Sequence, residues 1–166
     1  NCSDLIYLSL GKGIGCGILC NGQTVMGSTF MAGEIGNYLL DHDHLCNWGD
    51  TPLEHRLSSV RFQAFPGGLK AAVEGYAKGD PACCEIIEGF VHTLSIVIAN
   101  IVSFLDPDKV IIGGELSQYM DELIDDIQET MARISPFKVN VSLAHLRGDA
   151  YMMGAVAYAM KQMNEK

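Results

Sequence analysis

Residues 10–18 read Leu-Gly-Lys-Gly-Ile-Gly-Cys-Gly-Ile and hold the densest grouping of glycine in the chain. The apolar run over residues 5–10 that leads into this stretch predicts a strand, and residues 15–20 predict a second one. Glycine at every second position of the turn between them removes side chains that would block an incoming phosphate. The candidate phosphate-binding residues are Gly11, Lys12, Gly13 and Gly15. A tight turn with a β-bulge explains the same glycines without a ligand.

This glycine-rich turn matches neither of the common nucleotide-binding motifs. No Gly-Lys followed by Ser or Thr opens a helix, so the turn is not a Walker A loop. It is not the dinucleotide fingerprint either, because Asn21-Gly22 predicts a β-hairpin where that motif requires a helix.

Outward from this turn, strands and helices alternate in the second half of the chain. We expect Asp80 to cap a helix that begins at Pro81 and runs to about residue 105, where Asp106-Pro107 ends it. Ser117 is expected to cap an amphipathic helix over residues 118–134. Further strands are expected over residues 23–26, 110–112 and 139–143, and further helices from residues 51–52, over 69–78 and over 150–164. This order predicts a single α/β domain with a mixed sheet.

The last of these helices carries small residues, Gly154, Ala155 and Ala157, which predict a close-packing face. This face and the apolar stretch over residues 83–105 favour association with a second copy of the chain.

The composition indicates a folded and acidic protein. The chain has 166 residues, of which 48% are hydrophobic and 19% charged, a balance that excludes a disordered chain. Its net charge of -9 repels phosphate backbones and argues against direct nucleic-acid binding by these residues. Six cysteines show no disulfide-framework spacing, and the N-terminus does not read as a signal peptide, so we expect a cytoplasmic location. Polar residues interrupt the stretch 83–105, which predicts a buried helix rather than a membrane span.

Four other residues are candidates for binding a ligand. Gly113 and Gly114 follow a buried strand, where the backbone meets ligands in open α/β sheets, although a helix-entry turn also explains them. Glu34 lies in a loop between two glycines and can accept hydrogen bonds from sugar hydroxyls. Glu54 can do the same, or it can close a capping box with Thr51 at a helix start.

Potential zinc ligands gather in one stretch, at His42, His44, Cys46 and His55. Their spacing matches no common structural zinc pattern, so a solvated or locally hydrogen-bonded cluster is the simpler interpretation.

Taken in order, four segments resemble the ROK family, which groups sugar-responsive repressors with sugar kinases. Residues 10–18 resemble its L-G-T-G-I-G-x-G-I phosphate loop, and residues 32–36 match its A-G-E-I-G segment. Residues 110–116 resemble its strand-G-G-hydrophobic-Ser element near the adenosine site. Residues 148–157 resemble its closing G-x-D-A-x-x-x-G-A segment.

The resemblance implies an actin-like, ribonuclease-H-like fold of two lobes, with this chain as the second lobe alone. It implies that Glu34 and Glu54 bind a sugar, with Asn37 at the position where the family has a sugar-touching His. The family's first phosphate-binding strand, its catalytic Asp and the helix-turn-helix of its repressors would lie upstream. No catalytic residue is therefore expected within these residues.

The zinc motif of the family is degenerate here. The family takes one His from A-G-E-I-G-H and three Cys from C-x-C-G-x-x-G-C, whereas this chain keeps only Cys46. Asn37 replaces the His and Trp48 stands at the second Cys. Because a tetrahedral site needs four ligands, we expect zinc to be absent.

We therefore predict the effector-binding domain of a sugar-responsive transcriptional regulator. An ATP-dependent sugar kinase is the alternative, supported by the glycines of residues 11–17 and 113–114, and a remnant that binds nothing is a third. The expected partners are a small sugar or sugar phosphate, a second copy in a homodimer, and DNA only through another domain, with no membrane. No cofactor is expected for a regulator, and ATP with Mg²⁺ only for a kinase.

Overall fold

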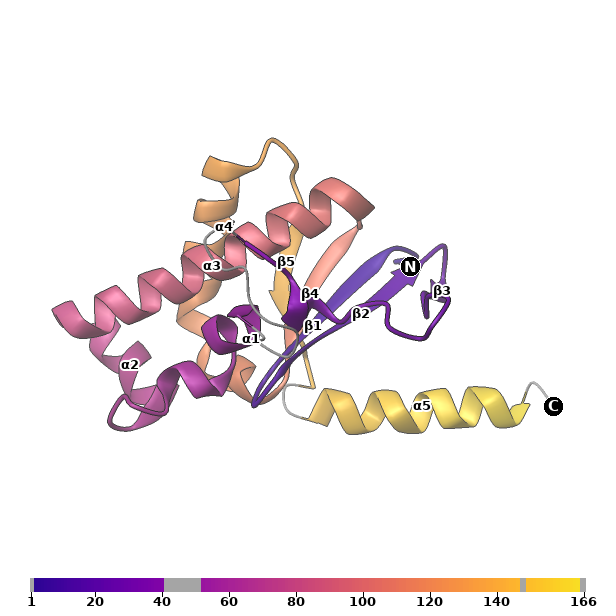
Figure 1. Cartoon of the computed structure of the whole chain (residues 1–166), viewed down its shortest axis with the longest axis horizontal. Helices are drawn as coiled ribbons and strands as arrows, with labels where there is room; N and C mark the ends of the chain where they lie inside the picture. Colours follow the sequence, from indigo (N-terminus) through magenta and orange to yellow (C-terminus); the bar gives the residue numbers. More distant parts are fainter. Residues whose placement is uncertain (1, 41–51, 147–148, 165–166) are drawn as a thin grey trace.

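The computed structural model describes residues 2–40, 52–146 and 149–164. A five-stranded mixed sheet in the order β3-β2-β1-β4-β5 forms its centre (Figure 1). β1 (Leu5–Leu10) pairs antiparallel with β2 (Ile14–Cys20), which pairs with the short β3 (Gln23–Thr24). On its other side β1 pairs parallel with β4 (Lys109–Gly113), and β4 pairs parallel with β5 (Asn140–Leu143). This sheet confirms the predicted α/β architecture.

The hairpin between β2 and β3 turns at the two residues that the sequence singled out. Asn21 and Gly22 have φ values of 50° and 74°, the left-handed conformation that a two-residue hairpin turn of this type requires at both positions. The hairpin prediction is confirmed, although β3 is only 2 residues long where residues 23–26 were expected.

The buried face of the sheet follows from the alternation of apolar residues along β1. Ile6, Leu8 and Leu10 are buried, and they are adjacent to buried side chains of β4 because Ile6 pairs with Val110 and Leu8 with Ile112. Together with α3 and the elements packed around it, this face forms one core cluster.

The longest helix, α3 (Pro81–Leu105), crosses the core as predicted. The Asp80 carboxylate accepts hydrogen bonds from the N–H groups of Ala82 and Cys83, both at 3.0 Å, and thereby caps the helix. The helix ends at Leu105, and its C-cap residue, Asp106, has a left-handed φ of 45°. Of the described helices α3 alone is long and apolar enough to cross a membrane by composition, and 50% of its most apolar stretch is buried in this fold.

The other helices surround α3, which packs against α2 (Gly68–Tyr76) and α4 (Ile124–Ile134). The short α1 (Pro52–Leu57) begins where a helix was predicted, while its predicted cap, Thr51, lies outside the described residues.

The start of α4 differs from the prediction. Ser117 does not cap a helix: its hydroxyl donates to the carbonyl of Gly114 at 2.7 Å, and the residue is buried in a 3₁₀ turn over Glu115–Tyr119. A second 3₁₀ turn over Asp121–Leu123 follows, so the α-helix begins only at Ile124.

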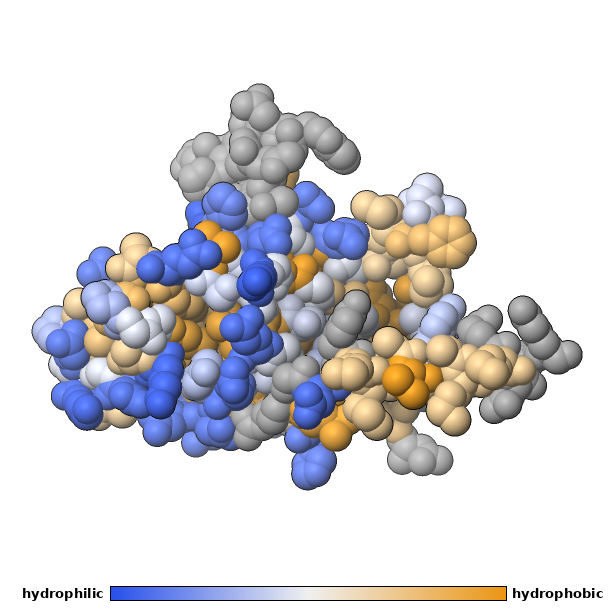
Figure 2. All heavy atoms as spheres, turned by 90° about the horizontal axis from the view of Figure 1, so that it is seen from below, coloured by the Kyte–Doolittle hydropathy of each residue, from blue (hydrophilic) through white to orange (hydrophobic). Residues whose placement is uncertain are grey.

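The last helix, α5 (Ala150–Asn164), has the predicted bounds and extends away from the body of the fold (Figure 1). Its apolar side chains are exposed, and Figure 2 shows them as a continuous apolar surface along the helix. The predicted small-residue face packs on none of the described residues: Gly154, Ala155 and Ala157 are exposed, and a Cβ on Gly154 would meet nothing within 4 Å.

Candidate functional site

The two glycine elements meet at the edge where β1 and β4 end. Parallel pairing aligns Ser9 with Gly113, so the turn after β1 and the turn after β4 lie side by side. A Cβ on Gly114 would lie 2.5 Å from the carbonyl oxygen of Leu10, and Gly114 has a φ of +85°. Only glycine can occupy this position, so close packing between the two turns is built into the chain.

The space beside Gly113 is also filled by a side chain of the same chain. A Cβ there would collide with the phenol of Tyr7, which projects from the neighbouring strand. Burial raises the pKa of Tyr7, and the backbone of Gly114 partly offsets this effect. No sequence pattern distinguishes Tyr7, because aromatic residues are common in strands.

The turn after β1 is fastened to the helical side of the site. The Gly11 N–H donates to the carbonyl of Gly13 at 3.0 Å, and the Gly11 carbonyl accepts from the N–H of Ser59 at 2.7 Å. Lys12, between these two glycines, is exposed. Gly15 lies outside this turn because it belongs to β2, where it pairs with Ser9; its role in phosphate binding stays a prediction.

Glu54 lies between the glycine turn and the loop that was predicted to bind sugar. A Cβ on Gly13 would lie 2.5 Å from Glu54 Oε1, and a Cβ on Gly36 would lie 3.8 Å from Glu54 Oε2. The fold thus brings together three segments that are far apart in the chain. The missing side chain of Gly13 leaves room for the Glu54 carboxylate.

The segment that carries Glu34 and Asn37 is attached to the edge of β2. The Cys16 N–H donates to the carbonyl of Gly33 at 3.1 Å, and a Cβ on Gly33 would collide with the Cys16 carbonyl oxygen. Gly33 also has a φ of +92°, so glycine is required for this close approach. Both predicted sugar-binding side chains are exposed: Glu34 directly precedes the 3₁₀ turn Ile35–Asn37, and Asn37 is its last residue. They can therefore reach a ligand in solution.

A cavity of about 420 Å³ adjoins the glycine turn. Its lining includes Ser59, Phe65, Lys70, Glu115, Leu116 and Tyr119. It reaches the turn because Ser59 is bonded to Gly11, and Glu115 Cβ would lie 3.7 Å from a Cβ on Gly11. Its size and its mixture of apolar and polar groups suit part of a small ligand.

The described residues do not form a zinc site. No group of three or more potential metal ligands occurs within residues 2–40, 52–146 and 149–164. Asn37 stands where the family has its His, and an amide is not among the usual zinc ligands. His42, His44, Cys46 and Trp48 lie outside the described residues, and His55 is exposed.

Comparison with known proteins identifies the relatives of the chain. The profile of the ROK family matches residues 1–162. An N-acetylmannosamine kinase of Escherichia coli is 28% identical over 95% of this chain and 57% of its own length. A xylose repressor of Caldicellulosiruptor bescii is 24% identical over 97% of this chain and 47% of its own length. The chain therefore spans about half the length of these relatives.

A solved structure with the same fold is that of a ROK family glucokinase from Streptomyces griseus in complex with glucose and AMPPNP. Its TM-score is 0.78 at 24% identity, over 93% of this chain and 60% of that one. The likeness shows the fold: the mixed sheet with helices described above is part of the actin-like fold of that protein.

Proposed function

Because the chain belongs to the ROK family, we propose that it is a carbohydrate-binding lobe and that it serves a sugar-responsive transcriptional regulator. The proposed ligand is a small sugar or sugar phosphate, held by Glu34, Asn37 and Glu54. The whole protein would bind DNA through a domain outside these residues and act in the cytoplasm. ROK relatives include both repressors and sugar kinases, so the choice between them rests on the site.

The observation that carries the sugar-binding proposal is the position of Glu54. Its carboxylate lies against Gly13 and next to Gly36, in the segment with Glu34 and Asn37. Carboxylate and amide oxygens accept hydrogen bonds from hydroxyl groups, which a sugar offers in a row. This set of acceptors therefore suits a neutral polyhydroxylated ligand.

The glycines of the site favour the regulator. The space above Gly13 holds the Glu54 carboxylate, which would repel a phosphate. The space at Gly113 holds the Tyr7 phenol, and that at Gly114 holds the backbone of Leu10. Packing within the chain therefore accounts for three of the glycines that were candidates for contact with nucleotide phosphates.

A regulator also demands less of the site than a kinase. A kinase must hold reacting atoms in a near-attack geometry, and small misplacements reduce the rate steeply. A sensor needs only different affinities for its ligand in two conformations. The exposed segment with Glu34 and Asn37 can meet the second demand more easily.

A sugar kinase is the second candidate, and one feature of the site favours it. Unlike Gly13, Gly11 has only ordinary contacts around its missing side chain, and it adjoins the 420 Å³ cavity. In a kinase Gly11 and Lys12 would hold the phosphates of Mg²⁺-ATP, and the cavity would hold its nucleoside. Bound ATP would supply the phosphoryl group, and the catalytic base would come from outside this chain.

The full-length protein tests this proposal in two parallel assays. The first measures ATP-dependent phosphorylation of xylose, glucose, N-acetylglucosamine and N-acetylmannosamine. The second measures release of the protein from its operator DNA by the same sugars. We expect sugar-dependent release without turnover, and we expect Glu34→Ala to abolish the response. Turnover on any of these sugars, without sequence-specific DNA binding, would establish the kinase instead.

A further inference from the structure

A 3₁₀ turn over Ser59–Phe62 connects the helix that carries Glu54 to the glycine turn after β1. The Ser59 N–H donates to the carbonyl of Gly11, as described above. The preceding N–H, that of Ser58, donates to the carbonyl of Glu54 at 2.9 Å. The position of this 3₁₀ turn therefore affects both the glycine turn and the end of α1.

The 3₁₀ turn is attached to α3 at two neighbouring residues. The Phe62 ring packs edge-on against Phe90, with 5.5 Å between the ring centroids. The Arg61 guanidinium donates from Nη2 to the carbonyl of Ile86 at 3.3 Å. One aromatic contact alone would allow the turn to rotate about the ring, so the second attachment, at Arg61, sets its orientation.

Gly89 of α3 makes room for this guanidinium. A Cβ on Gly89 would lie 2.7 Å from Arg61 Nη2, which is closer than real Cβ contacts. Gly89 is the only glycine in α3, and a glycine inside a helix lowers stability relative to alanine. The helix thus has its least favourable residue at the place where Arg61 lies.

The guanidinium is also held in an unfavourable environment. Within the part of the chain that the structure describes, Arg61 Nε is buried without a hydrogen-bond partner. Burial, followed by the like charge of Arg56, lowers the pKa of Arg61 because both disfavour the charged form. Arginine nevertheless keeps its charge in proteins. Unfavourable features on both sides of one contact indicate that the contact serves the site rather than stability.

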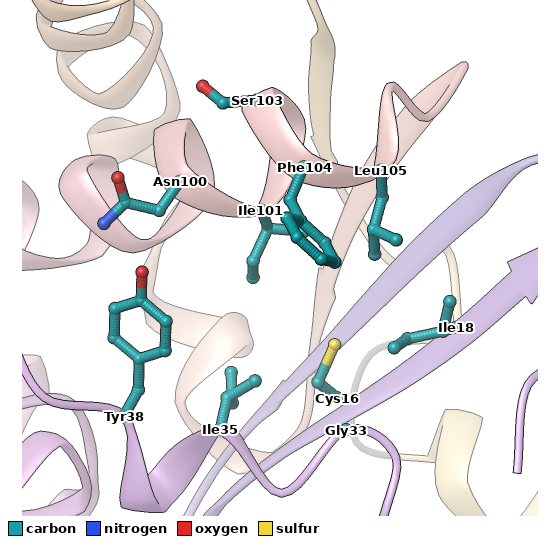
Figure 3. A pocket seen from close by; sticks show the side chains of 10 residues that line it. All are labelled: Cys16, Ile18, Gly33, Ile35, Tyr38, Asn100, Ile101, Ser103, Phe104 and Leu105. Atoms are coloured by element: carbon teal, nitrogen blue, oxygen red, sulfur yellow. The ribbon is translucent and has the colours of Figure 1, made fainter. Parts of the chain in front are cut away.

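The same helix borders the other half of the proposed sugar site. A cavity of about 480 Å³ lies between the end of α3 and the segment with Glu34 and Asn37. Figure 3 shows Ile101 of α3 facing Ile35 and Tyr38 across this cavity. α3 therefore lies beside both segments that carry the proposed sugar-binding carboxylates.

We propose that Arg61 is a positioning residue of the sugar site: seated in the space that Gly89 leaves on α3, it orients the 3₁₀ turn and through it the glycine turn and Glu54. When the guanidinium leaves α3, the turn can rotate and the hydrogen bond from Ser59 to the glycine turn weakens. The Glu54 carboxylate then loses its fixed place beside Gly13. The effect on sugar affinity rests on the proposed function, whereas the attachment of the turn to α3 does not.

Gly89→Ala in the full-length protein is the main test. Its new Cβ displaces the flexible end of Arg61, while alanine itself favours the helix, so the fold should persist. His92→Ala is the matched control, because it also places alanine at an exposed position of α3. Arg61→Ala removes the guanidinium outright, and Arg61→Lys keeps a charged donor for the Ile86 carbonyl. Urea unfolding checks that every variant folds.

Two readouts distinguish positioning from a purely structural role. Without sugar, the Ser59 amide should exchange its hydrogen about tenfold faster or more in Gly89→Ala and Arg61→Ala than in the wild type and His92→Ala. Calorimetric titration with xylose, glucose, N-acetylglucosamine and N-acetylmannosamine should give about fivefold weaker binding for the same two variants. Arg61→Lys should restore part of the affinity. Gly89→Ala should cause no further loss when it is added to Arg61→Ala, because both act on the same contact.

Each part of the proposal can fail separately. Unchanged exchange of the Ser59 amide in Gly89→Ala would overturn the attachment of the turn to α3. Faster exchange with unchanged sugar affinity would overturn the positioning role, and additive losses in the double variant would show that Gly89 does not act through Arg61. A wild-type protein that binds none of the four sugars would contradict the proposed function and the positioning role with it, and faster exchange in Gly89→Ala would still establish the attachment.

Discussion

Replacing Gly13 by alanine tests the position of Glu54 directly. The new Cβ would lie 2.5 Å from Glu54 Oε1, and real Cβ contacts are not shorter than 3.0 Å, so the carboxylate must move by at least 0.5 Å (3.0 - 2.5). The backbone at Gly13 is not in the left-handed region, so alanine adds no backbone strain there. The carboxylate is the flexible end of its side chain and can move, so the fold should keep its stability.

The expected loss falls on the ligand. A hydrogen bond to a charged acceptor contributes about 1.5–3 kcal/mol, and every 1.4 kcal/mol or so is tenfold in affinity. If the displaced carboxylate loses one such bond, Gly13→Ala should weaken sugar binding by about tenfold to 150-fold. Gly11→Ala is the matched control, because its Cβ would lie 3.7 Å from Glu115 Cβ, an ordinary contact.

Calorimetric titration of the full-length protein with xylose, glucose, N-acetylglucosamine and N-acetylmannosamine measures the affinities, and urea unfolding checks stability. Glu54→Gln provides the reference for a site without the charge. The reasoning is refuted if Gly13→Ala binds as the wild type does while Glu54→Gln does not bind. It is equally refuted if Gly11→Ala loses as much affinity as Gly13→Ala.

Three further results are expected. Gly114→Ala should lower the free energy of unfolding in urea by about 2 kcal/mol or more, because Gly114 has a φ of +85° and a Cβ there would collide with Leu10. The control Gly79→Ala should lower it by about 1 kcal/mol, because Gly79 has a φ of +73° but open space around it. Equal losses for the two variants would argue against the collision. Hydrogen bonds from the backbone of Cys83 lower the pKa of Asp80, so its stabilising effect should be present above its ordinary value of 3.8 and fade as the pH falls through the lowered pKa. Asparagine at position 80 can cap the helix but does not titrate. The Tm difference between wild type and Asp80→Asn should therefore shrink as the pH falls over that range, and a constant difference would contradict the charge effect. Elemental analysis of protein purified without chelator should find no stoichiometric zinc, and EDTA should not change the Tm; about one zinc per chain would overturn this expectation.

Helix bounds were predictable where the signals are local. Asp80 and Pro81 sit at the start of α3 and Asp106-Pro107 at its end, and each acts through its immediate neighbours. The start of α4 was not predictable in this way. Leu116, Met120 and Leu123 are all buried and recur at intervals of three and four residues, a pattern that an α-helix and successive 3₁₀ turns both satisfy.

The sequence was enough to predict which segments form the candidate site, but not how their residues contact one another. The sequence singled out the glycine turn, Glu34 and Glu54, and the family resemblance placed them in one site. The contact of Glu54 with Gly13 depends on how α1 packs against α3 and the 3₁₀ turn of residues 35–37, and no local pattern encodes it. Tyr7 and Ser59 were missed for the same reason, since their importance comes from the turns they touch.

The exposed apolar side chains of α5 make this helix a chemical reporter of its own surroundings. Peroxide oxidises accessible methionine to the sulfoxide, and each oxidation adds an oxygen that mass spectrometry can locate on a peptide. The methionines of α5 are exposed by 65%, 53%, 59% and 77%, at Met152, Met153, Met160 and Met163. Met120 and Met131 are 0% and 5% exposed and provide protected internal references. If the chain is one lobe of a longer protein, as proposed, the pattern of oxidation along α5 in the lobe alone and in the longer protein would show whether one side of the helix becomes covered.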